Sequence, residues 1–413
     1  MSALDDLILW NETKAAGPAR ERVEDALRPS AVAAAVARAA GSPEERAEAR
    51  LAVHHYLKGP LEERLRAARP HPGVDAALAA EEDPVLRRAI AFEHASRLGR
   101  LEGLVSERDA ARDEAARLAG AEDARTLVLA LRDPEAVAGA DEAERGFVAP
   151  TDAAVEEAVH AWALREGLDE VTAADAPRMA FLADRSRRAP DVPAGPFVRR
   201  VADDLKLRGA VAGGGSGPTA IALALDALGR SLHATFLREA RGPRAVALAD
   251  PAFEVAAGSL FRGLLATAAG LRAAGLPDDP AVLQALRVEK LVETRRAWGE
   301  LRSAARPAER RVLGRRTGGR PLSPEEAETA DLDLGPGDAS LTGRMFAALL
   351  EERLRTRFGN GWFARSEAGT YLRDLWAAEV EATPRRMAEA LALGTMDSAP
   401  LIESCSPTKG RPS

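Results

Sequence analysis

The stretch Asp226-Ala-Leu-Gly-Arg-Ser-Leu-His233 decides the fold. It follows a break rich in Gly and ending in Pro, and we predict that a helix over residues 218–240 carries it. Asp226, Arg230 and His233 lie at positions i, i+4 and i+7 of that helix, so they share one of its faces. We therefore expect the three side chains to face the same groove.

The spacing of this stretch matches a metal-binding pattern, although its residues do not. In His-Glu-x-x-His, two imidazoles four residues apart share a helix face, and the glutamate activates a metal-bound water. Here the three positions hold Asp226, Ala227 and Arg230. Carboxylates do ligate zinc, so Asp226 with Glu254 is one candidate pair of ligands. Arg230 argues against that pair, because a fixed positive charge repels a metal cation.

Length and composition point to a large helical protein. The chain has 413 residues, of which 4% are aromatic, and Ala, Leu, Arg and Glu dominate. This mixture favours helices that pack closely through small side chains, so we predict an all-α fold. The net charge of -7 provides no general attraction for nucleic acid or an anionic membrane. We expect neither as a partner.

The sequence lacks the marks of an exported or membrane protein. Its single cysteine, Cys405, excludes an intramolecular disulfide and a Cys-based zinc cluster. The first residues do not combine a basic region with an apolar core, and no stretch approaches the ~20 apolar residues that cross a bilayer. We therefore expect a cytoplasmic protein without a metal or other cofactor.

Punctuating residues divide the chain. Breaks rich in Pro and Gly occur at 189–196 and at 315–343. We predict an N-terminal helical lobe over 1–195, a second helical lobe over 196–400 and a disordered tail over 401–413. Capping residues directly before a proline predict helix starts. They are found at Ser42-Pro43, Asp279-Pro280 and Ser323-Pro324.

Three segments in order resemble the thimet oligopeptidase and oligoendopeptidase F family of zinc peptidases. The first is the helix over 218–238, which keeps Gly229, Leu232 and His233 where the family has His-Glu-x-Gly-His followed by another histidine. The third is 349–376, which is similar to a closing segment common in the family. The resemblance covers the second half of the chain, while the first half matches only as a helical lobe of suitable size.

The second segment, residues 250–265, resembles the helix that carries the third zinc ligand of the family, a glutamate. At the family's spacing this position falls on Val255. Glu254 is one residue away, which rotates its side chain by about 100° on a helix, away from the expected metal. The resemblance implies a two-lobed, all-α, metallopeptidase-like fold with a central cleft. Because the metal ligands and the general base are replaced, it does not imply peptidase activity.

The polar face of the helix over 218–240 has two interpretations. In one, Arg230 stands where the metal charge stood, is held by Asp226 and binds a ligand carboxylate through its planar fork. In the other, Asp226 and Arg230 form an ordinary ion pair beside a buried His233. Asp226, Arg230, His233 and Glu254 are accordingly the candidate ligand-binding residues, and no catalytic residue is assigned.

Other features of the sequence have simpler explanations. His54 and His55 are adjacent on a predicted helix, so they cannot hold one metal in the i, i+4 manner. The glycine-rich run at 213–217 lacks the Lys-Ser/Thr of a phosphate loop and is interpreted as a connector or hinge. A cluster of aromatic residues predicts core packing; it comprises Trp362, Phe363, Tyr371 and Trp376. A basic cluster is interpreted as a solvated helix end; it comprises Arg306, Arg310, Arg311, Arg315, Arg316 and Arg320.

These observations favour a non-catalytic, peptidase-like protein that binds a peptide or protein segment in its cleft. One alternative is an active enzyme, either with relocated metal ligands or with metal-free acid-base chemistry at Asp226 and His233. Another is a structural subunit that pairs with an active homologue or a different protein in a hetero-complex. The sequence identifies neither the ligand nor the partner.

Overall fold

The computed structural model describes the chain in segments. These are residues 27–40, 42, 45–46, 48–57, 77–78, 80–99, 102–129, 131, 146–147, 149–169, 171, 175, 190–207, 215–242, 245–246, 249–305, 337–378, 383–396 and 398–405. Within them the regular structure is helical, and the strand-like pairing is an isolated bridge between Pro193 and Ser216. The prediction of an all-α fold is confirmed.

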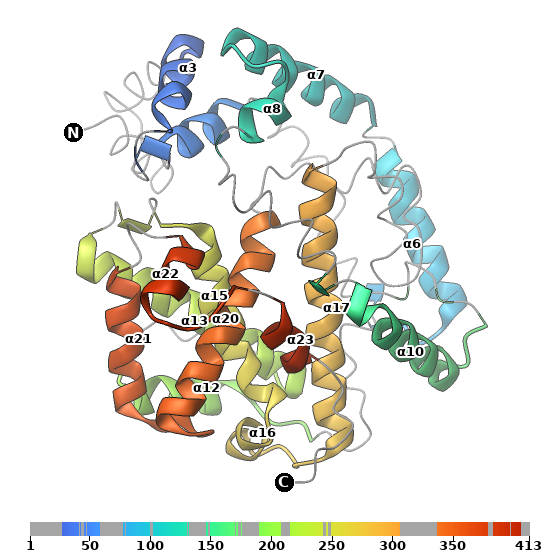
Figure 1. The fold of residues 1–413 in the computed structure, drawn as a ribbon. Coiled ribbons are helices and arrows are strands. Elements are labelled where there is room, and N and C mark those ends of the chain that lie inside the picture. The colour runs from blue at the N-terminus through green and yellow to red at the C-terminus, as the bar shows by residue number, and fades with distance from the viewer. Residues whose placement is uncertain are drawn as a thin grey trace.

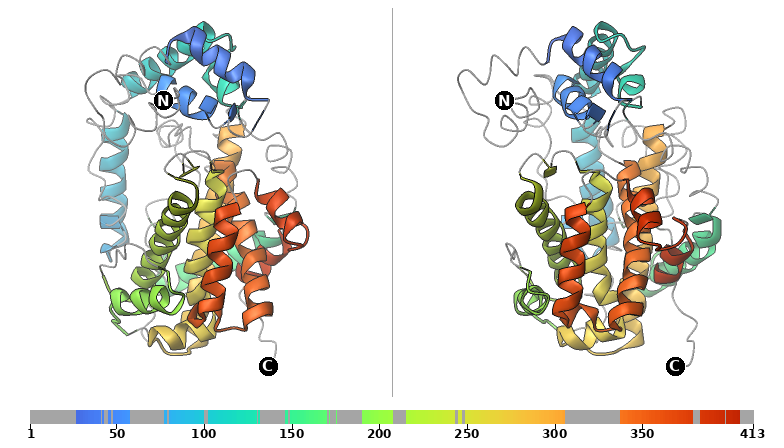
Figure 2. Two further views of the ribbon diagram at one scale, coloured as in Figure 1. Left: turned by 90° about the vertical axis from the view of Figure 1, so that its left-hand side faces the viewer. Right: turned by 60° about the vertical axis from the view of Figure 1, so that its left-hand side comes forward.

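A bundle of long helices forms the largest core. It contains α12 (Ala194–Asp204), α13 (Pro218–Arg241), α15 (Pro251–Gly263), α20 (Gly337–Phe358) and α21 (Ser366–Ala378), as Figures 1 and 2 show. α15 is the central helix, because α13 packs along one side of it and α20 along another. Nearly every residue of α15 from Ala252 onward is buried, as expected for a helix that neighbours surround.

Glycines set the short distances between these helices. A Cβ placed on Gly229 of α13 would lie 2.3 Å from the carbonyl oxygen of Ala257 on α15. A Cβ on Gly343 of α20 would lie 2.4 Å from the carbonyl oxygen of Ala252. Both contacts are with backbone that cannot turn aside, so only glycine allows these approaches. The close helix packing that the composition predicted is therefore present at these two glycines.

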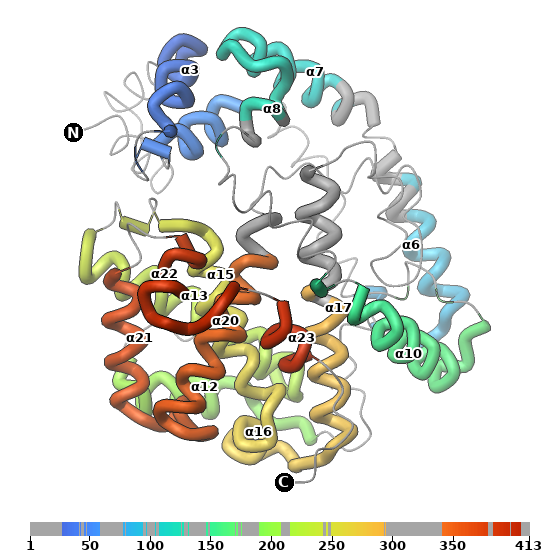
Figure 3. Tube along the Cα trace, in the orientation of Figure 1, coloured from blue at the N-terminus to red at the C-terminus, as the bar shows by residue number. Residues whose placement is uncertain are grey.

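α17 (Pro280–Ala305) flanks the bundle and lies between it and α10, a helix from the first half of the chain. It packs against α20, and Figure 3 shows the two helices side by side. α10 (Ala149–Glu166) packs on the other side of α17, where Trp162 meets Val288. The predicted helix start is confirmed, because the Asp279 carboxylate accepts a hydrogen bond of 2.8 Å from the Ala281 amide.

The N-terminal helices have a core of their own. α3 (Pro29–Arg38), α7 (Glu102–Leu118) and α8 (Ala124–Leu129) pack together at the top of Figure 1, with Val32 and Leu127 among their buried residues. α6 (Pro84–Gly99) lies at the right of the same view, below α7. The predicted cap at Ser42 is confirmed by the hydrogen bond from the Glu45 amide to its hydroxyl, 3.1 Å.

Shorter elements complete the bundle. They are the 3-10 turns η3 (Leu264–Ala266) and η5 (Trp362–Ala364) and the helices α16 (Ala268–Ala274), α22 (Pro384–Ala390) and α23 (Ala399–Cys405). The aromatic cluster is core, as predicted: Trp362, Phe363 and Trp376 are buried, and Tyr371 is partly buried against the same core, with its ring 6.1 Å from that of Phe358.

Two predicted boundaries are wrong. The disordered tail was expected from residue 401, but α23 extends to Cys405, and its Leu401 and Cys405 are fully buried against α20 and α17. The apolar pair lies four residues apart, which is enough to anchor a short helix. The long break was expected to run to residue 343, but α20 begins at Gly337. Residues 306–336 and 406–413, with the cap at Ser323 and the basic cluster, lie outside the described residues.

α13 is the one described helix that is long and apolar enough by composition to cross a membrane. Its apolar side chains are already used inside the protein. Leu225, Leu228 and Leu232 are almost completely buried between the neighbouring helices. A core helix of this kind passes the same test of length and hydropathy, so its apolar character is explained by packing.

Candidate functional site

The centre of the candidate site is an ion pair on α13. Arg230 Nε donates a hydrogen bond of 2.8 Å to Asp226 Oδ2. The two residues are four apart, so one turn of helix brings them together, as the sequence predicted. Asp226 occupies the first position of the metal-binding pattern and Arg230 the last. The guanidinium therefore lies where a second metal-binding imidazole would project.

Glu254 completes a group of three charges, and this corrects the prediction made for it. Its Oε1 lies 3.5 Å from Arg230 Nη1, whereas Val255 is buried and packs against Gly343 of α20. α15 lies between α13 and α20, and successive residues of a helix point about 100° apart. Glu254 therefore faces α13, while the next residue, Val255, faces α20. The glutamate, and not the valine, faces α13.

Gly258 forms the floor beneath the ion pair. A Cβ at this position would lie 2.7 Å from Asp226 Oδ1 and 3.0 Å from Arg230 Nε. The missing side chain therefore lets the pair lie flat against α15. Sequence reasoning did not single out Gly258, although a glycine inside an apolar helical pattern is a signal of close approach.

The three charged side chains are partly exposed. The exposed fraction is 36% for Arg230, 23% for Asp226 and 52% for Glu254. Burial alone would lower the pKa of Arg230, but the hydrogen bond and charge of Asp226, followed by the charge of Glu254, raise it above its ordinary value. Arg230 thus stays charged, and one cation between two carboxylates leaves a formal charge of about -1 on the group.

His233 is buried beside the ion pair, as in the second interpretation of this helix face, and does not share the open groove that was expected for all three side chains. Its side chain is buried, at 3% exposure, and its ring meets Trp376 of α21 edge-on at 6.1 Å. Seven residues along a helix correspond to about 700°, so His233 is turned by roughly 20° from Asp226. That small rotation and the position of α21 place His233 under the neighbouring helix. Among the four candidate residues, Asp226, Arg230 and Glu254 come together and His233 belongs to the core.

The group does not fit zinc. Two of the three side chains are carboxylates, but Arg230 contacts both of them and cannot act as a metal ligand because it has no lone pair to donate. A cation would have to displace the guanidinium from both oxygens. Within the described residues, no set of three or more His, Cys, Asp or Glu side chains has an arrangement suited to a metal.

The remaining candidates are structural where the structure describes them. The rings of His54 and His55 lie edge-to-face at 5.4 Å on one helix. The end of the glycine-rich run is held by backbone hydrogen bonds, from Ala194 N to Gly215 O and from Gly217 N to Val192 O. Gly215 and Gly217 both adopt positive φ angles, which explains glycine there. Gly213 and Gly214 lie outside the described residues.

Comparison with known proteins supports the fold relationship. No protein-family model and no curated protein matches the chain. Among solved structures, the chain is similar to one described as a "putative oligoendopeptidase F" from Bacillus anthracis str. Ames. The TM-score is 0.55 at 13% sequence identity, over 97% of this chain and 80% of the other. At this identity the match establishes a shared helical fold, and function has to be argued from the site.

Proposed function

We propose that this chain is a non-catalytic relative of the helical zinc peptidases, and that it binds a peptide or protein segment over the exposed face of α13 and α15. The observation that carries this proposal is the placement of Arg230 between Asp226 and Glu254, at 2.8 and 3.5 Å. In the family that the sequence resembles, a metal and its activated water stand over this helix. Here a protein cation takes their place.

The chemistry of the site favours binding over cleavage. Ala227, at the position of the general base, has no proton acceptor on its side chain. Asp226 is engaged by Arg230, which competes with any role as a base. Hydrolysis of a peptide bond needs an activated water and a group that stabilises the developing negative charge. The group of three supplies a guanidinium for the second task but no activated water for the first.

The same three side chains suit a peptide backbone. A peptide offers N–H donors and C=O acceptors in alternation, and the group offers carboxylate oxygens and guanidinium N–H groups side by side. Exposure of 52% at Glu254 and 36% at Arg230 leaves both accessible. A ligand that lay along α13 would pair its N–H groups with the carboxylates and its carbonyls with Arg230.

The first experiment measures binding and cleavage together. Purified protein is assayed for zinc content and for cleavage of a library of fluorescein-labelled unstructured peptides, and binding of the same library is measured by fluorescence anisotropy. We expect binding without cleavage and no stoichiometric zinc. Arg230→Ala should weaken binding about tenfold, the loss typical of a charge-assisted hydrogen bond. Arg238→Ala, an exposed arginine on the same helix, is the matched control. Stoichiometric zinc with peptide cleavage would overturn the proposal.

A second experiment restores the metal-binding pattern. The triple substitution Asp226→His, Ala227→Glu and Arg230→His removes the guanidinium and creates a helix face on which Glu254 is the third ligand. We expect about one zinc ion per chain in this variant and none in the unmodified protein, because Glu254 already faces α13. Adding Glu254→Ala should lower the zinc affinity again, whereas adding Val255→Ala should not.

A further inference from the structure

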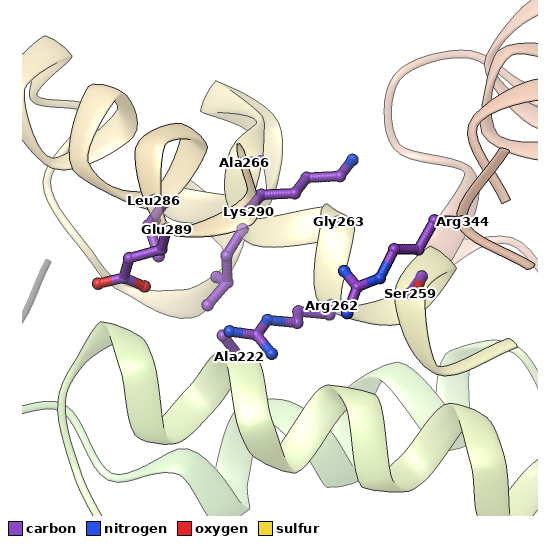
Figure 4. A pocket seen from close by; sticks show the side chains of 10 residues that line it. Ala222, Ser259, Arg262, Gly263, Ala266, Leu286, Glu289, Lys290 and Arg344 are labelled. Carbon is purple, nitrogen blue, oxygen red and sulfur yellow. The ribbon is translucent and has the colours of Figure 1, made fainter. Parts of the chain in front are cut away.

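Two groups of arginines on the bundle differ in whether their charges already have partners. The first group lies at a pocket of about 20 Å³, which is lined by Ala222 of α13 and Arg262 of α15. Figure 4 shows this pocket, and Lys290 and Arg344 also line it. Arg262 and Arg344 each have further interaction partners, so their charges do not call for an anion from solution.

The second group lies at the C-terminal end of α20, where an exposed arginine rests on two aromatic rings. The guanidinium carbon of Arg357 lies 5.2 Å from the centre of the Phe358 ring and 5.1 Å from that of Tyr371 on α21. The two ring centres are 6.1 Å apart. Guanidinium groups stack on aromatic rings, so these contacts restrict the orientation of the Arg357 side chain. Arg357, Phe358 and Tyr371 are called the arginine platform below.

The polar groups of the arginine platform are open to a partner. In the part of the chain that the structure describes, the Arg357 guanidinium forms no ion pair or hydrogen bond, and the Tyr371 hydroxyl forms no hydrogen bond. The other tyrosine, Tyr56, differs, because its hydroxyl donates a hydrogen bond of 2.8 Å to the Ala115 carbonyl. The arginine platform is also accessible, since Arg357 is exposed and both rings are partly exposed.

The turn that follows α20 leaves space beside the arginine platform. It contains Gly359 and Gly361, which are both exposed. An added Cβ at either position would meet no atom within 4 Å. The space over the turn is therefore open, and a partner segment can reach Arg357 from this side.

Nearby charges decide how a partner approaches. Arg353 precedes Arg357 by one turn of α20, so these two exposed arginines share a face and lie about 6 Å apart along the helix. On α21, Glu367 and Asp374 lie one turn before and one turn after Tyr371. Among the described residues, neither acid forms an ion pair with Arg357. A partner's carboxylates are therefore attracted along α20 and repelled from α21.

We propose that the arginine platform binds an acidic segment of a partner protein, with one carboxylate at Arg357 and the next at Arg353. The planar fork of Arg357 suits a carboxylate, which accepts two parallel hydrogen bonds, and the Tyr371 hydroxyl is a further donor nearby. Alternate side chains of an extended segment are about 6.6 Å apart, close to the spacing of one helical turn. Arginine and tyrosine are also residue types on which the binding energy of protein interfaces concentrates.

The arginine platform lies apart from the ion pair on α13, so this inference does not rest on the proposed function. A Cβ on Gly343 would contact Ala252 and Val255 of α15. Glu254 is therefore level with the first turns of α20. Arg357 follows Gly343 by 14 residues, which corresponds to about 21 Å at 1.5 Å per residue. The two sites can be changed one at a time.

The simpler explanation is that the arginines at this end of α20 only stabilise the helix through its dipole. That role requires a positive charge, whereas recognition of a carboxylate by Arg357 also requires the planar fork. Substitution by lysine separates the two, because lysine keeps the charge and lacks the fork. Arg355 is the matched control, since it is exposed in the same last turn and has no aromatic contact among the described residues.

The first test uses a fluorescein-labelled peptide in which Glu and Ser alternate, and the same peptide with Gln in place of Glu. Binding is measured by fluorescence anisotropy at low ionic strength, where exposed charges are least screened. We expect the Glu peptide alone to bind. Arg357→Lys should weaken its binding about tenfold, and Arg355→Lys should leave it unchanged. Equal effects of the two substitutions, equal binding of the two peptides, or no binding to the unmodified protein would overturn the proposal.

The second test changes the ring beneath Arg357. Tyr371→Phe keeps the ring and removes the hydroxyl, so it should weaken binding of the Glu peptide only about threefold, the net value of one hydrogen bond. Tyr371→Leu removes the ring and should weaken binding as much as Arg357→Lys. Far-ultraviolet circular dichroism verifies that each variant is folded, and Arg357→Lys retains the test if Tyr371→Leu unfolds. Full binding in Tyr371→Leu would contradict the role of the aromatic rings.

Two further outcomes identify a different ligand or a different site. A peptide with phosphoserine in place of Glu supplies the other anion that an arginine fork binds. Binding of the phosphoserine peptide without binding of the Glu peptide would contradict an acidic segment and indicate a phosphorylated partner. Arg230→Ala should leave binding of the Glu peptide unchanged. If Arg230→Ala abolished this binding and Arg357→Lys did not, the arginine platform would be excluded and the proposed function supported.

Discussion

The interface between α13 and α15 has an arginine at each end, Arg230 and Arg262, and the two arginines have different neighbours. At one end, Arg230 contacts Asp226 and Glu254 of the same site, and the group carries more negative than positive charge. At the other end, Arg262 joins Arg344 and a lysine around a pocket. Both ends lie along the same two helices. What differs is the nearest charge: two carboxylates contact Arg230, whereas Arg262 shares its pocket with a second arginine and a lysine.

The two arginines therefore differ in their immediate surroundings. Arg230 contacts two carboxylates of the protein, and these contacts hold the side chains of Asp226 and Glu254 in place. Arg262 and Arg344 line one pocket, and each of them has further interaction partners in the structure. Because the two ends lie on different turns of α13 and α15, they can be tested separately.

The largest effect should come from a methyl group inserted between α13 and α15. Gly229→Ala places a methyl group 2.3 Å from the Ala257 carbonyl oxygen, and backbone cannot move aside as a flexible side chain can. We expect a loss of about 2–3 kcal/mol in the free energy of unfolding, measured by urea denaturation, with damage to both ends. Gly361→Ala is the control, because no atom lies within 4 Å of its added methyl and its φ of -98° suits any residue. Equal stability of the two variants would contradict the close contact.

A smaller effect should follow at the ion-pair end alone. Gly258→Ala places its methyl group 2.7 Å from Asp226 Oδ1, but this carboxylate is a side chain and can rotate. We expect a loss of about 1 kcal/mol in unfolding free energy together with a displaced ion pair in a crystal structure. Unchanged stability of Gly258→Ala, with Asp226 and Arg230 in their original positions, would contradict the close contact beneath the ion pair.

The smallest effects concern the two partners of Arg230. Asp226→Asn should cost about 0.3–0.5 kcal/mol, the value of a partly exposed pair at i, i+4. Glu254→Gln should cost less, because the 3.5 Å contact is longer and Glu254 is 52% exposed. Double-mutant cycles with Arg230→Ala measure the two coupling energies from urea denaturation. A larger coupling energy for Glu254 than for Asp226 would contradict the prediction that Asp226 is the stronger partner of Arg230.

Much of the fold could be predicted because its signals are local. The helix that carries Asp226 and the cap at Asp279 follow from neighbouring residues along the chain. Their outcomes agree with prediction: α13 spans Pro218–Arg241, and α17 begins directly after the cap. The tail was harder, because Leu401 and Cys405 form a helix that is stabilised by burial against α20 and α17. Isolated helices of this length are unstable in water.

The candidate site could be predicted only in part. The pair of Asp226 and Arg230 lies within one turn of one helix, so the spacing was sufficient. The sequence predicted that Val255 faces the site and that Glu254 is turned away from it, whereas Glu254 contacts Arg230. Only the positions of α13 and α20 around α15 show which side each residue faces. For His233 the spacing left an open and a buried position as alternatives, and the neighbouring α21, which covers it, decides for the buried one.

The sequence by itself determined that the chain is helical and that Arg230 has a partner one turn away, and it places Asp226, Ala227 and Arg230 at the spacing of His-Glu-x-x-His. These properties depend on residue types and short spacings. The tertiary structure decided that Glu254 joins Arg230 and that Arg262, Lys290 and Arg344 surround one pocket. The physical reason is that these side chains come from different helices, and their meeting depends on helix contacts that glycines such as Gly229 permit.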